Sequence, residues 1–237
     1  MAVFEDEFLG TIGGGHLEFE AIAEARRYLL ASTGRQGLPT EKRFALGPSL
    51  GQCCGGALVL QFEWVDAADA ERLQGILQAL AAKRFQPLAL FGGGHVGKAL
   101  VQVLAPLPFH VRWIDSRDEI FPEAVPAQVI CEHSNPVHAA VNDLAAQSRV
   151  LIMSFSHAED LDIVAACLLR QRLHNDLPYI GLIGSATKWA TFKRRLAERG
   201  FSEAECQQVT CPIGVPGILG KEPEVIAVAV AAQLLQG

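Results

Sequence analysis

The sequence predicts an α/β protein in which a smaller α+β domain, residues 1–86, precedes a mostly parallel sheet covered by helices on both faces, residues 87–237. The chain has 237 residues and 50% of them are hydrophobic, so it can bury one large core or two ordinary ones. After Pro87, short apolar strands alternate with helical stretches, which is typical of a parallel sheet. A helical pattern ends at Gln86, immediately before this proline, and the domain boundary is expected there.

The first domain begins with an extended segment, a turn and a helix. Val3 to Ile12 is short and partly apolar and predicts a strand, which Gly13 to Gly15 interrupt. From Leu17 to Leu30, apolar residues recur with helical spacing while charges fall on the other side. The order is therefore strand, turn and helix.

Two more strands, a loop and a second helix complete the first domain. Phe44 to Leu46 and Ala57 to Val65 predict strands on either side of a glycine-rich loop, Gly47 to Gly56. Asp66 to Phe85 carries leucines and an isoleucine on one helical face and predicts a helix. We expect functional chemistry in the loop, where small residues leave room around the side chains.

The second domain repeats strand and helix in alternation. Leu88 to Phe91 predicts a strand, a glycine-rich turn follows, and Val96 to Leu104 predicts a helix that leads to a strand at Phe109 to Ile114. The remaining expected elements are strands near Gln128 to Cys131, Val150 to Met153 and Tyr179 to Ile183, with helices between them, and a last helix at Pro223 to Leu235.

A glycine motif marks the start of this second domain as Rossmann-type. Gly92, Gly94 and Gly97 form GxGxxG after an apolar strand and at the start of a helix, and Asp115 closes the next strand. The first glycine permits the tight turn, the second lets a phosphate approach the backbone, and the third lets the helix pack on the strand. Asp115 would accept hydrogen bonds from a ribose and repel a 2′-phosphate, although Arg117 nearby leaves NADP open as a ligand. The alternative is a Rossmann domain whose nucleotide pocket has been lost or reassigned.

The loop between the predicted strands of the first domain carries two adjacent thiols, Cys53 and Cys54. Thiolates are soft donors suited to sulfide chemistry and to thiophilic metals, so these cysteines are candidate metal ligands. The alternative is that they are small buried hydrophobes, the usual role of a free cysteine. The other cysteines are expected to be structural: Cys131, Cys167, Cys206 and Cys211.

Three further features each have two interpretations. The turn Gly13, Gly14, Gly15 precedes a helix and could form a second anion nest or only a tight turn. His157 and Asp160 follow a strand, at the edge where doubly wound sheets bind ligands, although a histidine there is more often structural. A basic helix is interpreted as a solvated face rather than a docking surface; its charges are Lys188, Lys193, Arg194, Arg195 and Arg199.

Charge, terminus and cysteine spacing exclude several functional classes. The net charge of −6 argues against nucleic acid, which is bound by a basic face. The first residues, Met1 to Glu7, show no signal-peptide pattern, and no apolar run is long enough to span a membrane, so a cytoplasmic protein is expected. In a cytosolic chain the six cysteines are expected to be reduced thiols, and none shows the CxxC spacing or the His/Cys array of a zinc site.

Taken together, the motifs resemble the xanthine dehydrogenase accessory proteins of the XdhC/CoxI family, and the resemblance covers essentially the whole chain. The segments that carry it are GTIGGGHLE at Gly10 to Glu18, LGPSLGQCCGG at Leu46 to Gly56, FGGGHVGKAL at Phe91 to Leu100, WIDSR at Trp113 to Arg117, YIGLIGS at Tyr179 to Ser185, PIGV at Pro212 to Val215, and GKEPEVIAVAVAAQLL at Gly220 to Leu235.

The resemblance implies a chaperone rather than a metabolic enzyme. Family members bind the molybdenum cofactor (molybdopterin), help it acquire a terminal sulfido ligand with a cysteine desulfurase, and insert it into the apo-subunit of a molybdenum hydroxylase of the xanthine dehydrogenase type. Gln52, Cys53 and Cys54 are assigned to the cofactor or its sulfur. The other residues assigned to cofactor, phosphate or NAD(P) are Gly13, Gly14, Gly15, Gly92, Gly94, His95, Gly97, Asp115 and Ser185.

The chain also departs from the family pattern. It begins at what resembles the methionine ending an upstream family segment, so a short N-terminus is expected. The family's TH.H..D pattern reads Ser154, Phe155, Ser156, His157 and then Asp160, which removes one histidine. The threonine often found before the proline of the last helix is Glu222, which weakens a side-chain cap.

Two rival functions and two assembly predictions stay open. An NAD(P)-dependent oxidoreductase would use Cys53 or Cys54 as nucleophile, but the sequence shows no His or Lys placed as its acid or base. A nucleotide-sensing module would use only the Rossmann half. We also expect the loop Gly47 to Gly56 to face the carboxyl edge of the Rossmann sheet. A homodimer or larger assembly is expected as well, because apolar edge surface lies near Val3 to Ile12.

Overall fold

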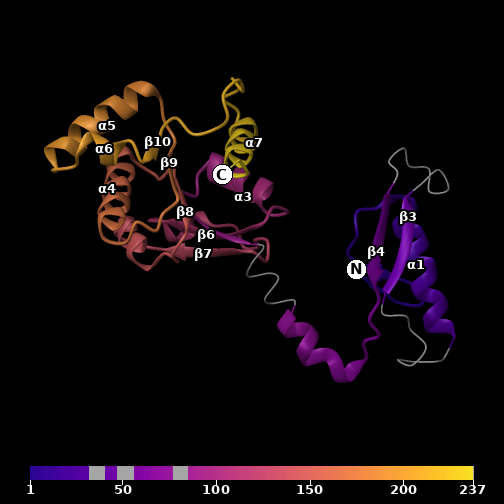
Figure 1. The fold of residues 1–237 in the computed structure, drawn as a ribbon. Coiled ribbons are helices and arrows are strands. Elements are labelled where there is room, and N and C mark those ends of the chain that lie inside the picture. Colours follow the sequence, from indigo (N-terminus) through magenta and orange to yellow (C-terminus); the bar gives the residue numbers. More distant parts are fainter. Residues whose placement is uncertain (32–40, 47–55, 77–84, 237) are drawn as a thin grey trace. The chain divides into compact units, whose positions relative to one another are not determined.

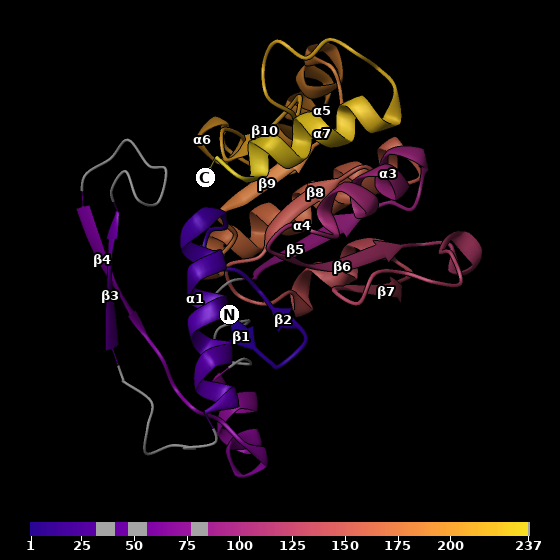
Figure 2. The same ribbon diagram turned by 90° about the vertical axis from the view of Figure 1, so that its right-hand side faces the viewer.

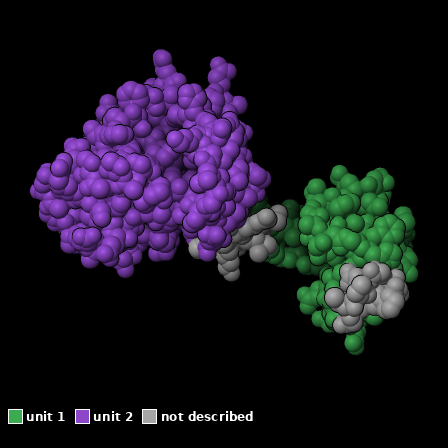
Figure 3. Space-filling model, turned by 90° about the horizontal axis from the view of Figure 1, so that it is seen from above, with its two compact units in different colours: residues 1–76 green, residues 77–237 purple. Residues whose placement is uncertain are grey.

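The structure is a computed structural model, and it describes residues 1–31, 41–46, 56–76 and 85–236. The chain forms two compact units, Met1–Ile76 and Leu77–Gly237, which Figure 3 colours separately. The sequence places its boundary later, between Gln86 and Pro87. In the structure both residues belong to the first strand of the second unit's sheet. Each unit is described below by itself.

The first unit opens with a small hairpin rather than one strand. Strands β1 (Ala2–Val3) and β2 (Phe8–Leu9) pair antiparallel, and the amide of Phe4 donates to the carbonyl of Glu7 across the turn (2.8 Å). The prediction of a continuous strand from Val3 to Ile12 is therefore wrong, because a local turn folds the segment back on itself. Helix α1 (Gly15–Leu30) follows, close to its expected bounds.

A second antiparallel pair follows in the first unit. Strand β3 (Glu41–Leu46) pairs along its whole length with β4 (Gly56–Gln61), which ends before the expected Val65. A 3-10 turn, η3 (Ala67–Asp69), then leads into helical residues 70–76, and the side chain of Asp66 caps it. The remainder of the helix expected up to Phe85 falls on residues 77–84, outside the described residues.

The second unit is a six-stranded, all-parallel sheet with the order β10-β9-β8-β5-β6-β7. Its strands are β5 (Gln86–Phe91), β6 (Phe109–Asp115), β7 (Val129–His133), β8 (Arg149–Ile152), β9 (Tyr179–Leu182) and β10 (Val209–Thr210). This is the doubly wound Rossmann order, so the predicted α/β fold class is confirmed. The two-residue strand β10 was not predicted, since so short a strand has no periodicity of its own.

Helices cover both faces of this sheet. In Figure 2 the strands β7, β6, β5, β8 and β9 lie side by side, with α3 and α7 in front of the sheet and α4 behind it. Figure 1 shows α5 and α6 on the same side of the sheet as α4. The helices are α3 (His95–Leu104), α4 (His157–His174), α5 (Ala186–Glu198), α6 (Glu203–Cys206) and α7 (Pro223–Leu234), with 3-10 segments η4 (Asp118–Ile120) and η5 (Val137–Asp143).

The alternation of side chains along β5 builds two separate cores. Leu88 and Leu90 point to one face and pack with residues of α3 and α7. Ala89 and Phe91 point to the other face and pack with α4, α5 and η5. All four are at most 1% exposed, as expected for a central strand covered on both sides.

No helix in the part of the chain that the structure describes is both long and apolar enough to cross a membrane.

Candidate functional site

The topological switch point of the sheet lies between β5 and β8, which are neighbours although β6 and β7 separate them in sequence. Ligands of doubly wound folds bind in the crevice at the carboxyl ends of these two strands. The glycine turn after β5 and the Ser154 loop after β8 both lie at this edge.

Gly92 makes the turn possible. Its φ is +122°, and a Cβ there would lie 2.0 Å from the carbonyl oxygen of Met153. The backbone of Gly92 is fixed by its amide, which donates to the carbonyl of Ile114 (2.8 Å), and by its carbonyl, which accepts from the indole of Trp113 (2.9 Å). A side chain at this position would force the ends of β5 and β8 apart.

The other two glycines of the motif have different surroundings. A Cβ on Gly97 would lie 2.1 Å from the carbonyl oxygen of Gly92, so this glycine lets α3 approach the turn. A Cβ on Gly94 would meet no described atom within 4 Å, and Gly94 is exposed, as is His95 at the start of α3. The motif therefore has two glycines required by packing and a middle one that faces open space, where a ligand could approach the backbone.

Asp115, at the end of β6, is buried and fully hydrogen-bonded by the chain itself. Its Oδ2 accepts from the Gly93 amide (2.6 Å) and from Nη2 of Arg117 (2.9 Å). Its Oδ1 accepts from the Arg117 amide (2.9 Å) and Nε (2.8 Å). Burial alone would raise the pKa of Asp115, but these hydrogen bonds outweigh it and hold the pKa below its ordinary value. The carboxylate that the sequence assigns to a ribose thus fastens the glycine turn.

A second polar cluster lies on the other side of the switch point. The buried carboxylate of Asp160 accepts from the hydroxyl (2.7 Å) and amide (2.8 Å) of Ser154 and from Nζ of Lys188 (2.7 Å). Nζ of Lys188 also donates to the carbonyl of Ile183 at the end of β9 (2.8 Å). The side chains of Lys188 and Asp160 are 12% and 3% exposed. The three residues bring together the ends of β8 and β9 and the first turns of α4 and α5.

Lys188 corrects the interpretation of the basic helix. The prediction that the charges of this helix face solvent is wrong for Lys188, although Lys193 and Arg199 do form exposed ion pairs. Its position three residues after Ser185, which caps α5 directly after a strand, is the signal that places it at the ligand edge. It also supplies the acid or base candidate that the sequence lacked for the oxidoreductase alternative.

Two of the residues named from the sequence at this edge have structural contacts. The hydroxyl of Ser185 accepts from the amide of Lys188 (3.2 Å) as the N-cap of α5. His157 begins α4 after its cap Ser156 and lies edge-on to Phe192, with ring centroids 6.3 Å apart.

The glycine turn of the first unit is occupied by a side chain of its own helix. Gly13, Gly14 and Gly15 all have positive φ. The Glu18 carboxylate accepts from the Thr11 hydroxyl, from the Ile12 amide (2.8 Å) and from the Gly14 amide (3.3 Å). The Thr11 hydroxyl and the Ile12 amide hold the pKa of Glu18 below its ordinary value. The anion nest expected here therefore contains Glu18.

Gln52, Cys53 and Cys54 lie outside the described residues, so their part in the site and the facing of the loop Gly47 to Gly56 stay predictions. The other four cysteines are free thiols. Cys167 is buried in α4, and burial raises its pKa to about 12, which keeps it protonated. Among the described residues, no three His, Cys, Asp or Glu side chains are grouped to hold a metal ion.

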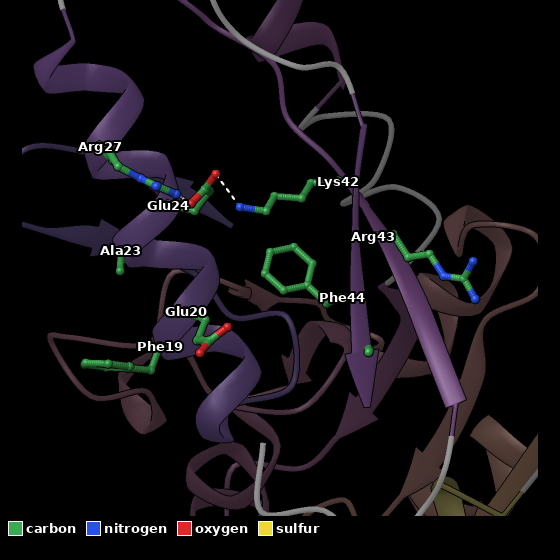
Figure 4. A pocket seen from close by; sticks show the side chains of 9 residues that line it. Phe19, Glu20, Ala23, Glu24, Arg27, Lys42, Arg43 and Phe44 are labelled. Atoms are coloured by element: carbon green, nitrogen blue, oxygen red, sulfur yellow. Dashed lines mark ion pairs between the residues drawn. The ribbon is translucent and has the colours of Figure 1, made fainter. Parts of the chain in front are cut away.

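The first unit has a cavity of about 630 Å³ between α1 and β3 that the sequence did not indicate (Figure 4). Its lining combines Phe19, Ala23, Phe44 and Ala45 with the charged Glu20, Glu24, Arg27, Lys42 and Arg43. The buried Glu24 lies between Arg27 and Lys42 and pairs with both, and the Tyr28 hydroxyl donates to it (2.6 Å). Arg27 and Lys42 thus share one carboxylate within the chain.

Comparison with known proteins agrees with this architecture. Residues 88–234 match the family model of the XdhC Rossmann domain, and residues 1–41 match that of the XdhC and CoxI family. An uncharacterised Escherichia coli K12 protein, YqeB, is 27% identical over 236 residues, which span 98% of this chain and 39% of that protein. This chain therefore covers well under half of that relative.

A crystal structure of a Bacillus halodurans protein, described as a xanthine dehydrogenase, superposes with a TM-score of 0.76 at 19% identity, covering 99% of this chain and 84% of the other. The family matches, spread over both units, show that the chain belongs to the XdhC/CoxI family.

Proposed function

We propose that this protein is a maturation factor for molybdenum hydroxylases of the xanthine dehydrogenase type. In this role it binds the molybdenum cofactor, works with a cysteine desulfurase while the cofactor gains its sulfido ligand, and passes the cofactor to the apo-subunit of the hydroxylase. Membership of the XdhC/CoxI family supports the proposal. The observation that carries it is the open position at Gly94, at the switch point of the sheet.

The described residues fit the phosphate end of molybdopterin. The backbone at Gly94 and His95 is exposed at the start of α3, where helix amides favour an anion. Gly92 and Gly97 keep this backbone in place, because neither position has room for a Cβ. When bound, the cofactor would supply the molybdenum and its dithiolene ligands, and the protein would supply binding and shelter from water. The soft donors suited to that end are Cys53 and Cys54, as the sequence predicts.

The test compares molybdenum retention in three forms of the full chain, each purified from molybdenum-replete cells. Wild type should carry molybdenum and pterin fluorescence. Cys53→Ser combined with Cys54→Ser should lose most of the molybdenum without a change in melting temperature, because a hydroxyl is a hard donor of similar size. Cys131→Ser is the matched control, a half-buried thiol on β7, and should retain the metal.

Two outcomes would contradict the proposal. One is a double variant that retains molybdenum at the wild-type level. The other is a double variant that melts at a much lower temperature while its folded fraction retains the metal, as expected if the thiols are only core residues; burying two unpartnered hydroxyls costs about 1–3 kcal/mol each.

A second candidate, an NAD(P)-dependent oxidoreductase, is favoured by one observation. Lys188 is largely buried and paired with Asp160 next to the switch point, where a proton donor or acceptor could meet a bound substrate. Turnover of NADH or NADPH by the full chain purified from molybdenum-depleted cells would support this candidate over the first.

A further inference from the structure

We propose that Arg117, rather than Asp115, is the residue that contacts the ligand beside the glycine turn, and that the site prefers a ligand with a phosphate monoester there over one with a free ribose diol. The inference concerns the ligand selectivity of the Rossmann unit and does not require that the protein bind molybdenum. It depends on the contacts of Asp115, Arg117, Ile120 and Phe155.

Asp115 has no acceptor left for a ribose. A carboxylate offers about four lone-pair positions, and Asp115 accepts four hydrogen bonds, one from the Gly93 amide and three from Arg117. Its side chain is 1% exposed. A ribose diol could reach this carboxylate only by displacing Arg117.

The side chain of Ile120 further restricts the access of a ribose to the carboxylate of Asp115. A Cβ on Gly93 would lie 2.7 Å from Cγ1 of Ile120 and 3.3 Å from Oδ2 of Asp115. The Ile120 side chain therefore lies directly over the backbone that leads to the carboxylate. In a site built for a ribose diol, this is the space that the sugar would need.

Arg117, in contrast, can meet a ligand. Its side chain is 35% exposed, and its hydrogen bonds to Asp115 use two of the five guanidinium N–H donors. Among the described residues no further acceptor takes the rest. The guanidinium lies 4.5 Å from the ring centroid of Phe155, so it is held between the ends of β6 and β8. A preorganised guanidinium with free donors suits a phosphate, which it can bind through two hydrogen bonds.

The charges around Arg117 determine whether its preference for a phosphate monoester appears as selectivity between ligands or as tight binding of free phosphate. Arg117 is already paired with Asp115, and Glu159 is near enough to raise the pKa of Arg117 together with Asp115. The Glu159 carboxylate accepts from the Ser116 hydroxyl (2.6 Å) and the Phe155 amide (3.2 Å). The edge is thus not strongly positive, and we expect discrimination between matched ligands rather than tight binding of free phosphate.

Two sources could supply a phosphate monoester: the 2′-phosphate of an adenine dinucleotide or the phosphate of a pterin cofactor. The experiment therefore titrates two matched pairs into the full chain by calorimetry, NADP⁺ against NAD⁺, and a pterin monophosphate against the same pterin without phosphate. In at least one pair the phosphorylated ligand should bind roughly ten- to a hundredfold more tightly, the range of a charge-assisted hydrogen bond. The pair that shows the preference identifies the source.

Variants link the preference to the arginine. Arg117→Ala should abolish it by weakening binding of the phosphorylated ligand alone, because Ile120 still lies over the backbone that leads to Asp115. If this variant does not fold, Arg117→Gln removes the charge and retains a hydrogen-bonding group for Asp115. The matched control is Arg172→Ala: Arg172 also pairs with a carboxylate, that of Glu205, and its guanidinium lies 4.6 Å from the Phe201 ring centroid, but it lies in the last turn of α4. The control should retain the wild-type preference.

The proposal is overturned if neither pair shows a preference, if none of the four ligands binds, or if the preference survives in the folded Arg117 variant. Because the ligands contain no molybdenum, these results are separate from those of the retention experiment on Cys53 and Cys54.

Discussion

Gly92 and Gly94 stand two residues apart in one motif, yet the structure gives them opposite roles. Gly92 adopts a positive φ and touches the backbone of Met153, so its lack of a side chain holds β5 and β8 together. Gly94 has a φ of −69° and faces open space. The first glycine is required by the fold, and the second is available to a ligand.

Alanine at each position should separate these roles. Gly92→Ala should lower the free energy of unfolding by about 2–4 kcal/mol, because it adds both backbone strain and a clash that side-chain motion cannot relieve. Gly94→Ala should change it by less than about 0.5 kcal/mol and instead weaken any ligand that reaches the backbone. Chemical denaturation of both variants checks this. Equal destabilisation by the two substitutions would show that the turn does not have the described geometry.

Some contacts of the site residues could be predicted from the sequence, and others could not. GxGxxG with its strand, helix and acid predicted the turn correctly, because those spacings are local. The contacts of Asp115 with Gly93 and Arg117, and of Lys188 with Asp160, were not predictable in the same way. The second pair joins side chains 28 positions apart, and their meeting depends on the order of the strands.

Helix α1 is capped at its N-terminus by Glu18, a residue of its own first turn. Helix α1 begins after three glycines of positive φ and lacks a side-chain hydrogen bond from its N-cap, Gly14. Glu18, in the first turn, reaches back to Thr11 and to the amides of Ile12 and Gly14. A carboxylate near a helix N-terminus is also favoured by the helix dipole. The arrangement explains why an apparent anion nest is followed by an acidic residue.

This cap should respond to acid. The pKa of Glu18 is lower in the folded chain than in the unfolded chain, where a free glutamate titrates at about 4.3. The cap therefore stabilises the fold fully above the unfolded pKa. This stabilisation is lost as the pH falls through the lower, folded pKa. Amide chemical shifts of Ile12 and Gly14 should therefore titrate with a midpoint below that of an ordinary glutamate. Glu18→Gln should remove the transition, and Thr11→Val should move it upward. A midpoint at the ordinary value or above would rule out the cap.

The two units differ in how much apolar surface they bury. The described residues of Met1–Ile76 bury Leu17, Ala21 and Phe44, whereas Leu77–Gly237 contains two extensive apolar clusters, one on each face of its sheet. In the first unit, Phe8 and Leu9 are 46% and 61% exposed. The homodimer expected through this edge stays a prediction that light scattering can test.

The second unit should therefore fold alone. A chain limited to residues 77–237 is expected to unfold cooperatively, with a melting temperature within about 3 °C of the upper transition of the full chain. The full chain should show a lower transition as well, from the first unit, visible by calorimetry. A single transition in the full chain together with an unfolded fragment would mean that the two units are stable only together.

Sequence alone was sufficient for the α/β class, five of the six strands of the Rossmann sheet, the glycine turn and the family, because periodicity, turn residues and motif spacing are properties of neighbouring positions. It failed at Val3 to Ile12, where a hairpin of two short strands replaces one strand, and at Lys188, where a charge assigned to solvent is largely buried. Tertiary structure decided that Asp115 is satisfied by Arg117 and Gly93 and that Glu18 fills its own glycine turn. A carboxylate accepts from whichever donors the folded backbone brings within hydrogen-bonding distance. Some of these donors are near in sequence, as Arg117 is to Asp115, and others are distant, as Gly93 is, so the residue type and the spacing alone do not identify them.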